Sequence, residues 1–187
     1  MTRRISFALA QLVFLLSLSS VAHASVLQAR DHLTPKEIDL VKDAQELGQR
    51  IDVFIKAADR RLMIINGTKP APSKNQKADA ELWGDLPTGS RSELVGDIAK
   101  ILDEAITNID DVSLRDEKNP ALPKALRKLS AAATRIIDQL KPLESSVSTP
   151  TEASNFAQLM ENAETIVDAA SKLGPEAMKQ KKVNSKQ

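Results

Sequence analysis

The densest charge beside apolar residues lies between Arg50 and Arg61. Within this stretch Asp52 and Asp59 are seven residues apart, and Arg60 and Arg61 follow directly. Seven residues are about two helical turns, so the two acids share one side of a helix, at the edge of an apolar stripe. Charged side chains in such a place bind a charged ligand or form ion pairs between helices. We therefore expect interhelical ion pairs here, and we keep Asp52, Asp59, Arg60 and Arg61 as candidate partner or ligand contacts.

A second group of acids recurs at the same spacing further along the chain. Asp97, Glu104 and Asp111 are seven residues apart, a pattern that could hold a divalent cation. On a helical wheel, however, they lie opposite the apolar residues of their own segment. We therefore expect a solvated face here and predict no metal site.

Groups that carry out covalent or proton-transfer chemistry are scarce. The sequence has no cysteine, no tyrosine and two histidines, of which only His32 lies beyond the first 24 residues. The lack of cysteine excludes thiolate nucleophiles and zinc–cysteine sites. A bundle-type di-iron site needs Glu-x-x-His on two helices, and the sequence has neither copy. We predict no catalytic residue, no cofactor and no enzyme activity.

Four helical segments position these residues, and their first residues are recognisable as caps. Residues 34–65 begin with a capping box of Thr34 and Glu37 and form one predicted helix of about 32 residues, or roughly 48 Å. A second helix begins at Ser90 and ends near residue 112. The third carries an apolar heptad over residues 122–147 and should kink or end near Pro142. The fourth runs from Thr149 to residue 173.

The pattern indicates an all-α fold. No stretch alternates apolar and polar residues as a half-buried strand does. Each apolar stripe is wide enough to touch two neighbours, which favours an antiparallel four-helix bundle with one long loop, residues 67–88, between helices 1 and 2. Residues 91–112 hold two basic and six acidic residues, and residues 121–147 hold five basic and two acidic ones. We therefore expect these two helices to be neighbours in a hairpin.

Trp83 lies in the long loop within a small apolar island that also contains Leu82 and Leu86. An aromatic residue in such a place either docks on the helices or anchors a partner protein. We expect docking, and we keep Trp83 as a further candidate contact because the sequence does not exclude the second role.

The start of the chain predicts export. Arg3 and Arg4 precede an apolar stretch over residues 5–18, and Ala22-His23-Ala24 fits a secretory cleavage site. We expect residues 1–24 to be a signal peptide, residues 25–175 one helical domain and residues 176–187 a basic flexible tail. The apolar run of about 14 residues is short of the roughly 20 that span a membrane. The protein would then be periplasmic or extracellular, with no transmembrane span after cleavage.

These observations favour a non-enzymatic, exported helical protein that binds another protein or a second copy of itself. A formal net charge of +1 gives no case for nucleic acid as the partner. A reversible lipid-surface binder is one alternative.

The other alternative is an enzyme that needs only cations. In architecture the predicted fold resembles the secreted all-helical chorismate mutases. In such enzymes cations bind the two carboxylates of a substrate and favour a compact geometry. The resemblance implies a dicarboxylate ligand here, and the available cations would be Arg50, Arg60, Arg61, Arg127 and Arg135.

Overall fold

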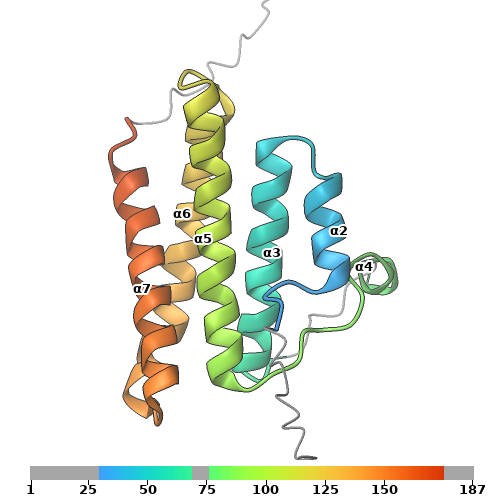
Figure 1. Ribbon diagram of the computed structural model, residues 1–187, viewed down its shortest axis with the longest axis vertical. Coiled ribbons are helices and arrows are strands. Elements are labelled where there is room, and N and C mark those ends of the chain that lie inside the picture. The colour runs from blue at the N-terminus through green and yellow to red at the C-terminus, as the bar shows by residue number, and fades with distance from the viewer. Residues whose placement is uncertain (1–29, 69–75, 175–187) are drawn as a thin grey trace, which may run out of the picture. The chain divides into compact units, whose positions relative to one another are not determined.

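The chain folds into helices that begin at the predicted capping residues. We describe residues 30–68 and 76–174 of a computed structural model, so the predicted signal peptide and basic tail lie outside the described residues. The described part is all-helical and contains no strand. Its elements are α2 (Pro35–Asp43), α3 (Leu47–Ile65), α4 (Gln76–Trp83), α5 (Arg91–Arg115), α6 (Ala121–Leu140), the 3₁₀-helix η1 (Lys141–Ser146) and α7 (Pro150–Ser171) (Figure 1).

Three of these helices have the predicted side-chain caps. The hydroxyl of Thr34 accepts a hydrogen bond from the backbone N–H of Glu37, whose carboxylate accepts one from the N–H of Thr34. Ser90 and Glu93 make the same reciprocal pair at the start of α5. Thr149 caps α7. The capping boxes are therefore confirmed, and each satisfies backbone donors that a helix start leaves unpaired.

The first predicted helix is wrong in one respect: it is two helices, α2 and α3. The chain leaves helical geometry at Ala44, and α2 folds back beside α3 (Figure 1). Arg50 stabilises the break, because its guanidinium donates two hydrogen bonds to the Ala44 carbonyl, at 3.2 and 2.9 Å. The apolar spacing continues through the break, so the pattern does not reveal it.

The long loop is also more structured than predicted, because it contains α4. The described part therefore has six α-helices where four were expected. Trp83 at the end of α4 is buried, with 7% of its surface exposed, and it belongs to the hydrophobic core. Leu82 and Leu86 are 53% and 40% exposed. The island thus docks through the tryptophan alone.

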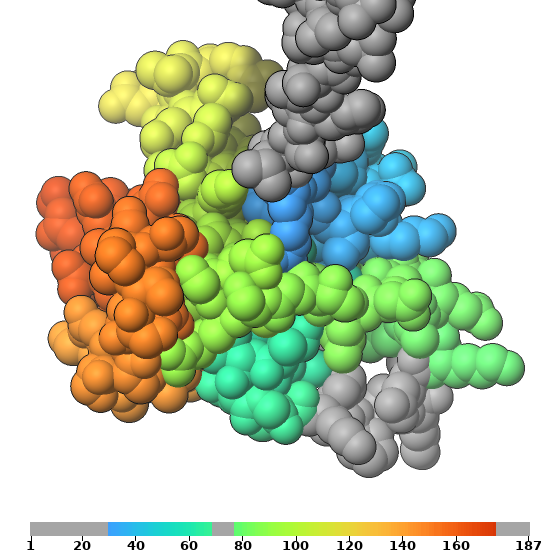
Figure 2. Space-filling model, turned by 60° about the horizontal axis from the view of Figure 1, so that its bottom comes forward, coloured from blue at the N-terminus to red at the C-terminus, as the bar shows by residue number. Residues whose placement is uncertain are grey.

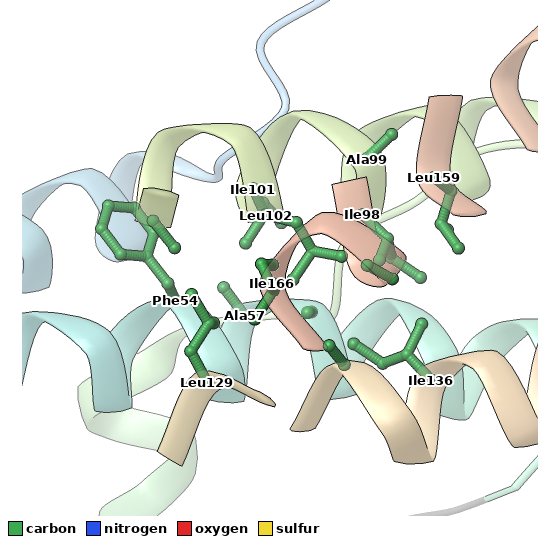
Figure 3. Close-up of a cluster of buried hydrophobic side chains, with 14 of the residues drawn as sticks. Phe54, Ala57, Ile98, Ala99, Ile101, Leu102, Leu129, Ile136, Leu159 and Ile166 are labelled. Carbon is green, nitrogen blue, oxygen red and sulfur yellow. The ribbon is translucent and has the colours of Figure 1, made fainter. Parts of the chain in front are cut away.

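The four longer helices share one core. Figure 3 shows Phe54 of α3, Ile98 of α5, Leu129 of α6 and Leu159 of α7 pointing into the same cluster, and all four are fully buried. Helix α5 packs mainly against α3 and α7, and α6 packs against the same two helices. The predicted neighbours α5 and α6 are in contact, but less extensively than either is with α3 and α7, so they are not the main pair that was predicted.

The directions of neighbouring helices follow from residue pairs that repeat every seven residues. Asn155 and Asn162 of α7 donate hydrogen bonds to the carbonyls of Ser92 and Ala99 in α5, at 2.8 and 2.9 Å. From the first pair to the second, the residue number rises by seven in α7 and by seven in α5, so α5 and α7 are parallel. Helices α3 and α6 are parallel by the same argument, since their ion pairs also advance together (see below). The arrangement therefore contains parallel neighbours as well as antiparallel ones.

The opposite net charges of α5 and α6 did not make them the main neighbours, because surface charge contributes less to stability than core packing does. An exposed ion pair stabilises by under about 1 kcal/mol, so opposite net charges choose neighbours only weakly. Core packing and the two amide hydrogen bonds to α5 outweigh them.

Among the described helices, none combines the length and the apolar character needed to cross a membrane.

Candidate functional site

A buried cluster of charge lies where α2 and α5 meet α3. The carboxylate of Glu37 is fully buried and accepts hydrogen bonds from Arg60 Nη1 at 2.7 Å and from Arg61 Nη1 and Nη2 at 3.0 and 2.8 Å. Arg60 and Arg61 are themselves 5% and 1% exposed. Two cations thus share one carboxylate inside the protein, which compensates for most of the cost of burying them.

Backbone carbonyls accept further hydrogen bonds from the Nη groups of the two arginines, whereas the buried Arg61 Nε makes none within the described residues. Arg61 donates to the carbonyls of Ala57, at 2.7 Å, and His32, at 2.5 Å. Arg60 donates to the carbonyls of Gly84, at 3.0 Å, and Asp85. Gly84 has a φ of +63°, which lets the chain turn sharply over Arg60. Figure 2 shows the segment that leads from α4 into α5 lying between α2 and the end of α3.

Opposing influences set the pKa of the Glu37 carboxyl. Burial alone would raise this pKa. The hydrogen bonds from Arg61 and from the backbone of Thr34, together with the charges of Arg61 and Arg60, outweigh burial and hold the pKa below its ordinary value of 4.5. The carboxylate is therefore ionised at neutral pH.

Trp83 belongs to the same region. Its ring lies beneath the ammonium group of Lys56, at 4.7 Å from the ring centroid, and beneath the guanidinium of Arg60, at 5.6 Å. Both distances suit a cation–π contact. The structure thus brings together three of the five predicted contact residues, namely Arg60, Arg61 and Trp83.

The other two predicted residues lie elsewhere. Asp52 pairs with Lys128 at 2.7 Å, and Asp59 pairs with Arg135 at 2.5 Å. Both pairs join α3 to α6 and are partly exposed to solvent. For these two acids the structure shows the expected interhelical ion pairs.

The acids of α5 differ from the solvated face that their wheel position predicts. Asp97 is only 5% exposed, and its carboxylate lies 3.6 Å from Arg61 Nε. Glu104 accepts a hydrogen bond from His32 Nε2 at 2.8 Å. The chain before α2 covers this side of α5, and a wheel drawn for one helix does not include that cover. Within the described residues no group of three or more potential ligands could hold a metal ion.

Glu37 is the central residue that the sequence analysis missed. The capping box by itself accounts for a glutamate at this position, so its own place in the sequence gives no separate sign that Glu37 is buried. A usable indication was present in its partners, because two adjacent arginines beside apolar residues need a carboxylate if they are buried. The sequence does not show which carboxylate folds back to them.

The arginines do not converge as the dicarboxylate alternative requires. Arg60 and Arg61 meet, but Glu37 already occupies the place of an anion between them. Arg50 binds Ala44 and Asn108, Arg127 binds the carbonyl of Gly174, and Arg135 binds Asp59.

A second candidate site is a groove at the far end of the molecule, where α5 and α6 extend beyond the ends of α3 and α7 (Figure 1). Its volume is about 570 Å³. We call it the end groove, and its apolar lining comes from α5, the turn after it, α6 and the end of α7: Ile109, Pro120, Leu122, Pro123, Leu126 and Leu173. Asp110 and Glu117 line it as well.

Leu114 directly follows Ser113, which lines the end groove, but it is not itself a lining residue. It is 86% exposed, more than any other large hydrophobic residue in the described part. On the α5 wheel it is about 40° from Asp110, which lines the groove. An apolar surface of this kind is typical of a place where another molecule binds.

Comparison with known proteins gave no match: no family model, no curated protein and no solved structure corresponds to this chain. The two sites that bear on function are the buried charge cluster and the end groove.

Proposed function

We propose that this is an exported, non-enzymatic helical protein that binds another protein through the end groove. In this proposal α3, α5, α6 and α7 form a four-helix bundle, with α2 and α4 packed against α3. The observation that carries the proposal is the end groove itself, an apolar hollow; the exposed Leu114 is next in sequence to Ser113 of its lining. Interfaces between proteins centre on apolar anchors of this kind.

The buried charge cluster supports a structural role for the arginines. A dicarboxylate could reach Arg60 and Arg61 only by displacing Glu37, whose hydrogen bonds to them are 2.7 to 3.0 Å long. Displacement would leave Glu37 ionised and buried without its partners, which is costly. The proposal therefore assigns these residues to the attachment of α2 to α3.

Export is part of the proposal and rests on the predicted signal peptide. The partner should then occur in the compartment to which the protein is delivered. An exported protein without cysteine is stabilised by its core and its ion pairs rather than by disulfides.

The proposal is tested by photo-crosslinking in the native host. A photoreactive residue replaces Ser113, which lines the end groove, in one variant, and Gln158, on the exposed face of α7, in a matched control. We expect a crosslinked protein from the Ser113 variant that the Gln158 variant does not yield. Leu122→Asp in the Ser113 variant should abolish this product. Equal crosslinking from both positions would contradict the proposal.

A further inference from the structure

We infer that the end groove receives a basic segment with apolar anchors, contributed by a different protein. This inference rests on the proposed function and specifies the chemistry of the partner. Its basis is the combination of an apolar floor with carboxylates on one rim.

The carboxylates of the rim come from the last turns of α5 and the turn that follows. Asp110 and Glu117 line the groove, and Asp103 precedes Asp110 by two helical turns on the same side of α5. Asp111 and Asp116 are exposed nearby. Within residues 30–68 and 76–174, none of these five carboxylates is in an ion pair.

Some acids elsewhere on the described surface are already paired. Asp52, Asp59 and Asp168 each pair with a lysine or arginine. Other exposed acids, such as Glu144 and Glu161, are in no ion pair within the described residues, so the lack of a pair does not by itself distinguish the groove. The carboxylates beside the groove combine availability to an external cation with an apolar floor. Lys118 also lines the groove, and Arg115 precedes it on the chain; these two cations reduce the local negative charge without cancelling it.

The apolar floor of the groove favours a binding segment that has apolar anchor residues. Leu122 and Leu126 are one helical turn apart on α6 and half-buried, and Leu173 faces them from the end of α7. A helix that binds such a groove inserts apolar residues spaced three or four apart and leaves its other face free. Lysine or arginine beside those anchors would reach Asp110 and Glu117.

Two other occupants are possible, and the experiment separates them from a foreign segment. Residues 175–187 of this chain contain four lysines and follow closely in sequence after Leu173, which lines the groove. A second copy of the chain could supply the same segment. In either case a synthetic peptide with the sequence of residues 175–187 would bind the protein at least as well as a designed probe.

The probe is a fluorescent helical peptide of about 14 residues, with leucines on one face and lysines beside them. Its control has glutamate at each lysine position. Binding to the full mature chain is measured by anisotropy at low and physiological salt. The test variant carries Asp110→Lys and Glu117→Lys, and its matched control carries Glu144→Lys and Glu161→Lys, two exposed acids outside the groove.

We expect the lysine peptide to bind at least about tenfold more weakly to the Asp110→Lys, Glu117→Lys variant, and within about twofold of the native affinity to the control variant. Binding of the native chain should weaken as salt screens the exposed charges. Leu122→Asp should also weaken it. Circular dichroism of each variant verifies that the exposed substitutions leave the fold intact.

Three results would overturn the inference. The first is that the glutamate peptide binds as well as the lysine peptide. The second is that both charge-reversed variants lose affinity for the lysine peptide equally. The third is that the peptide of residues 175–187 outcompetes the probe. None of these three results affects the crosslink that the proposed function predicts for the Ser113 variant. If that crosslink is found and the captured protein binds the charge-reversed variant normally, the proposed function stands and the inferred chemistry is wrong.

Discussion

Both carboxylate oxygens of Glu37 accept hydrogen bonds from the guanidinium of Arg61, at 3.0 and 2.8 Å. In one continuous helix these residues would be about 36 Å apart. The break at Ala44 removes that separation by folding α2 back on α3. One side chain thus caps α2 through Thr34 and attaches it to the body of the protein.

Removal of the Glu37 carboxylate should therefore be strongly destabilising. Glu37→Ala leaves Arg60 buried without its anion and Arg61 with only Asp97, at 3.6 Å, and we expect a loss of about 3–5 kcal/mol in the free energy of unfolding. Asp39→Ala on the exposed face of the same helix should change it by less than about 0.5 kcal/mol. Urea denaturation monitored by circular dichroism measures both. Similar losses for the two variants would contradict the arrangement.

The lowered pKa of Glu37 also predicts how its contribution varies with pH. A carboxyl whose pKa is lower in the folded state than in the unfolded state stabilises the fold above the unfolded pKa, here 4.5. This stability is lost as pH falls below 4.5 through the folded pKa. The difference in unfolding free energy between the native chain and Glu37→Gln should thus be constant near neutral pH and shrink below pH 4.5. A difference that grows on acidification would show that the sign is wrong.

The parallel register of α5 and α7 predicts that the effect of Gly96→Ala on stability changes sign when Asn155 is also replaced by alanine. A Cβ at Gly96 would lie 2.9 Å from Asn155 Nδ2, which is held by its hydrogen bond to Ser92. We expect Gly96→Ala to destabilise the native chain by about 1 kcal/mol or more. In an Asn155→Ala background the clash is absent, and alanine should stabilise α5 by up to about 1 kcal/mol. Thermal unfolding of the four chains tests this, and the same sign in both backgrounds would contradict the register.

Trp83 should report its burial directly, because it is the only tryptophan in the chain. Its emission should be blue-shifted and poorly quenched by iodide, since only 7% of its surface is exposed. In Glu37→Ala the emission should shift to the red, because the segment around Gly84 loses part of its attachment when Arg60 loses its anion. Freely quenched emission from the native chain would mean that Trp83 does not dock.

Two leucines provide a comparison of core and surface. Leu129 is fully buried, and Leu129→Ala should cost about 2–5 kcal/mol in the free energy of unfolding. Leu114 is 86% exposed, and Leu114→Ala should cost less than about 0.5 kcal/mol while weakening the binding of a partner at the end groove. A large loss of stability in Leu114→Ala would indicate that this residue serves the fold instead.

The sequence predicts the local features of this fold well. The caps at Thr34, Ser90 and Thr149 and the end of α6 before Pro142 follow from short-range chemistry that the sequence displays. The all-helical class follows from the spacing of apolar residues. These features depend only on residues within a few turns of one another.

The remaining features depend on contacts between distant residues. The break at Ala44 occurs within an uninterrupted apolar pattern, and Arg50 stabilises it from the next helix. Glu37 and Asp97 are buried because other segments cover them. The choice of α7 rather than α6 as the main neighbour of α5 depends on core packing and on Asn155 and Asn162, which are not part of the apolar pattern.

Hydrogen–deuterium exchange of the mature chain, alone and with the protein captured at Ser113, tests the proposed binding surface most directly. We predict that added protection is confined to the end of α5, the following turn, the first half of α6 and the last turn of α7, within residues 105–126 and 168–174. Residues 35–43 and 150–160 should exchange at the same rate in both states. Protection centred on α2 or on the first half of α7, with the end groove unchanged, would contradict the account.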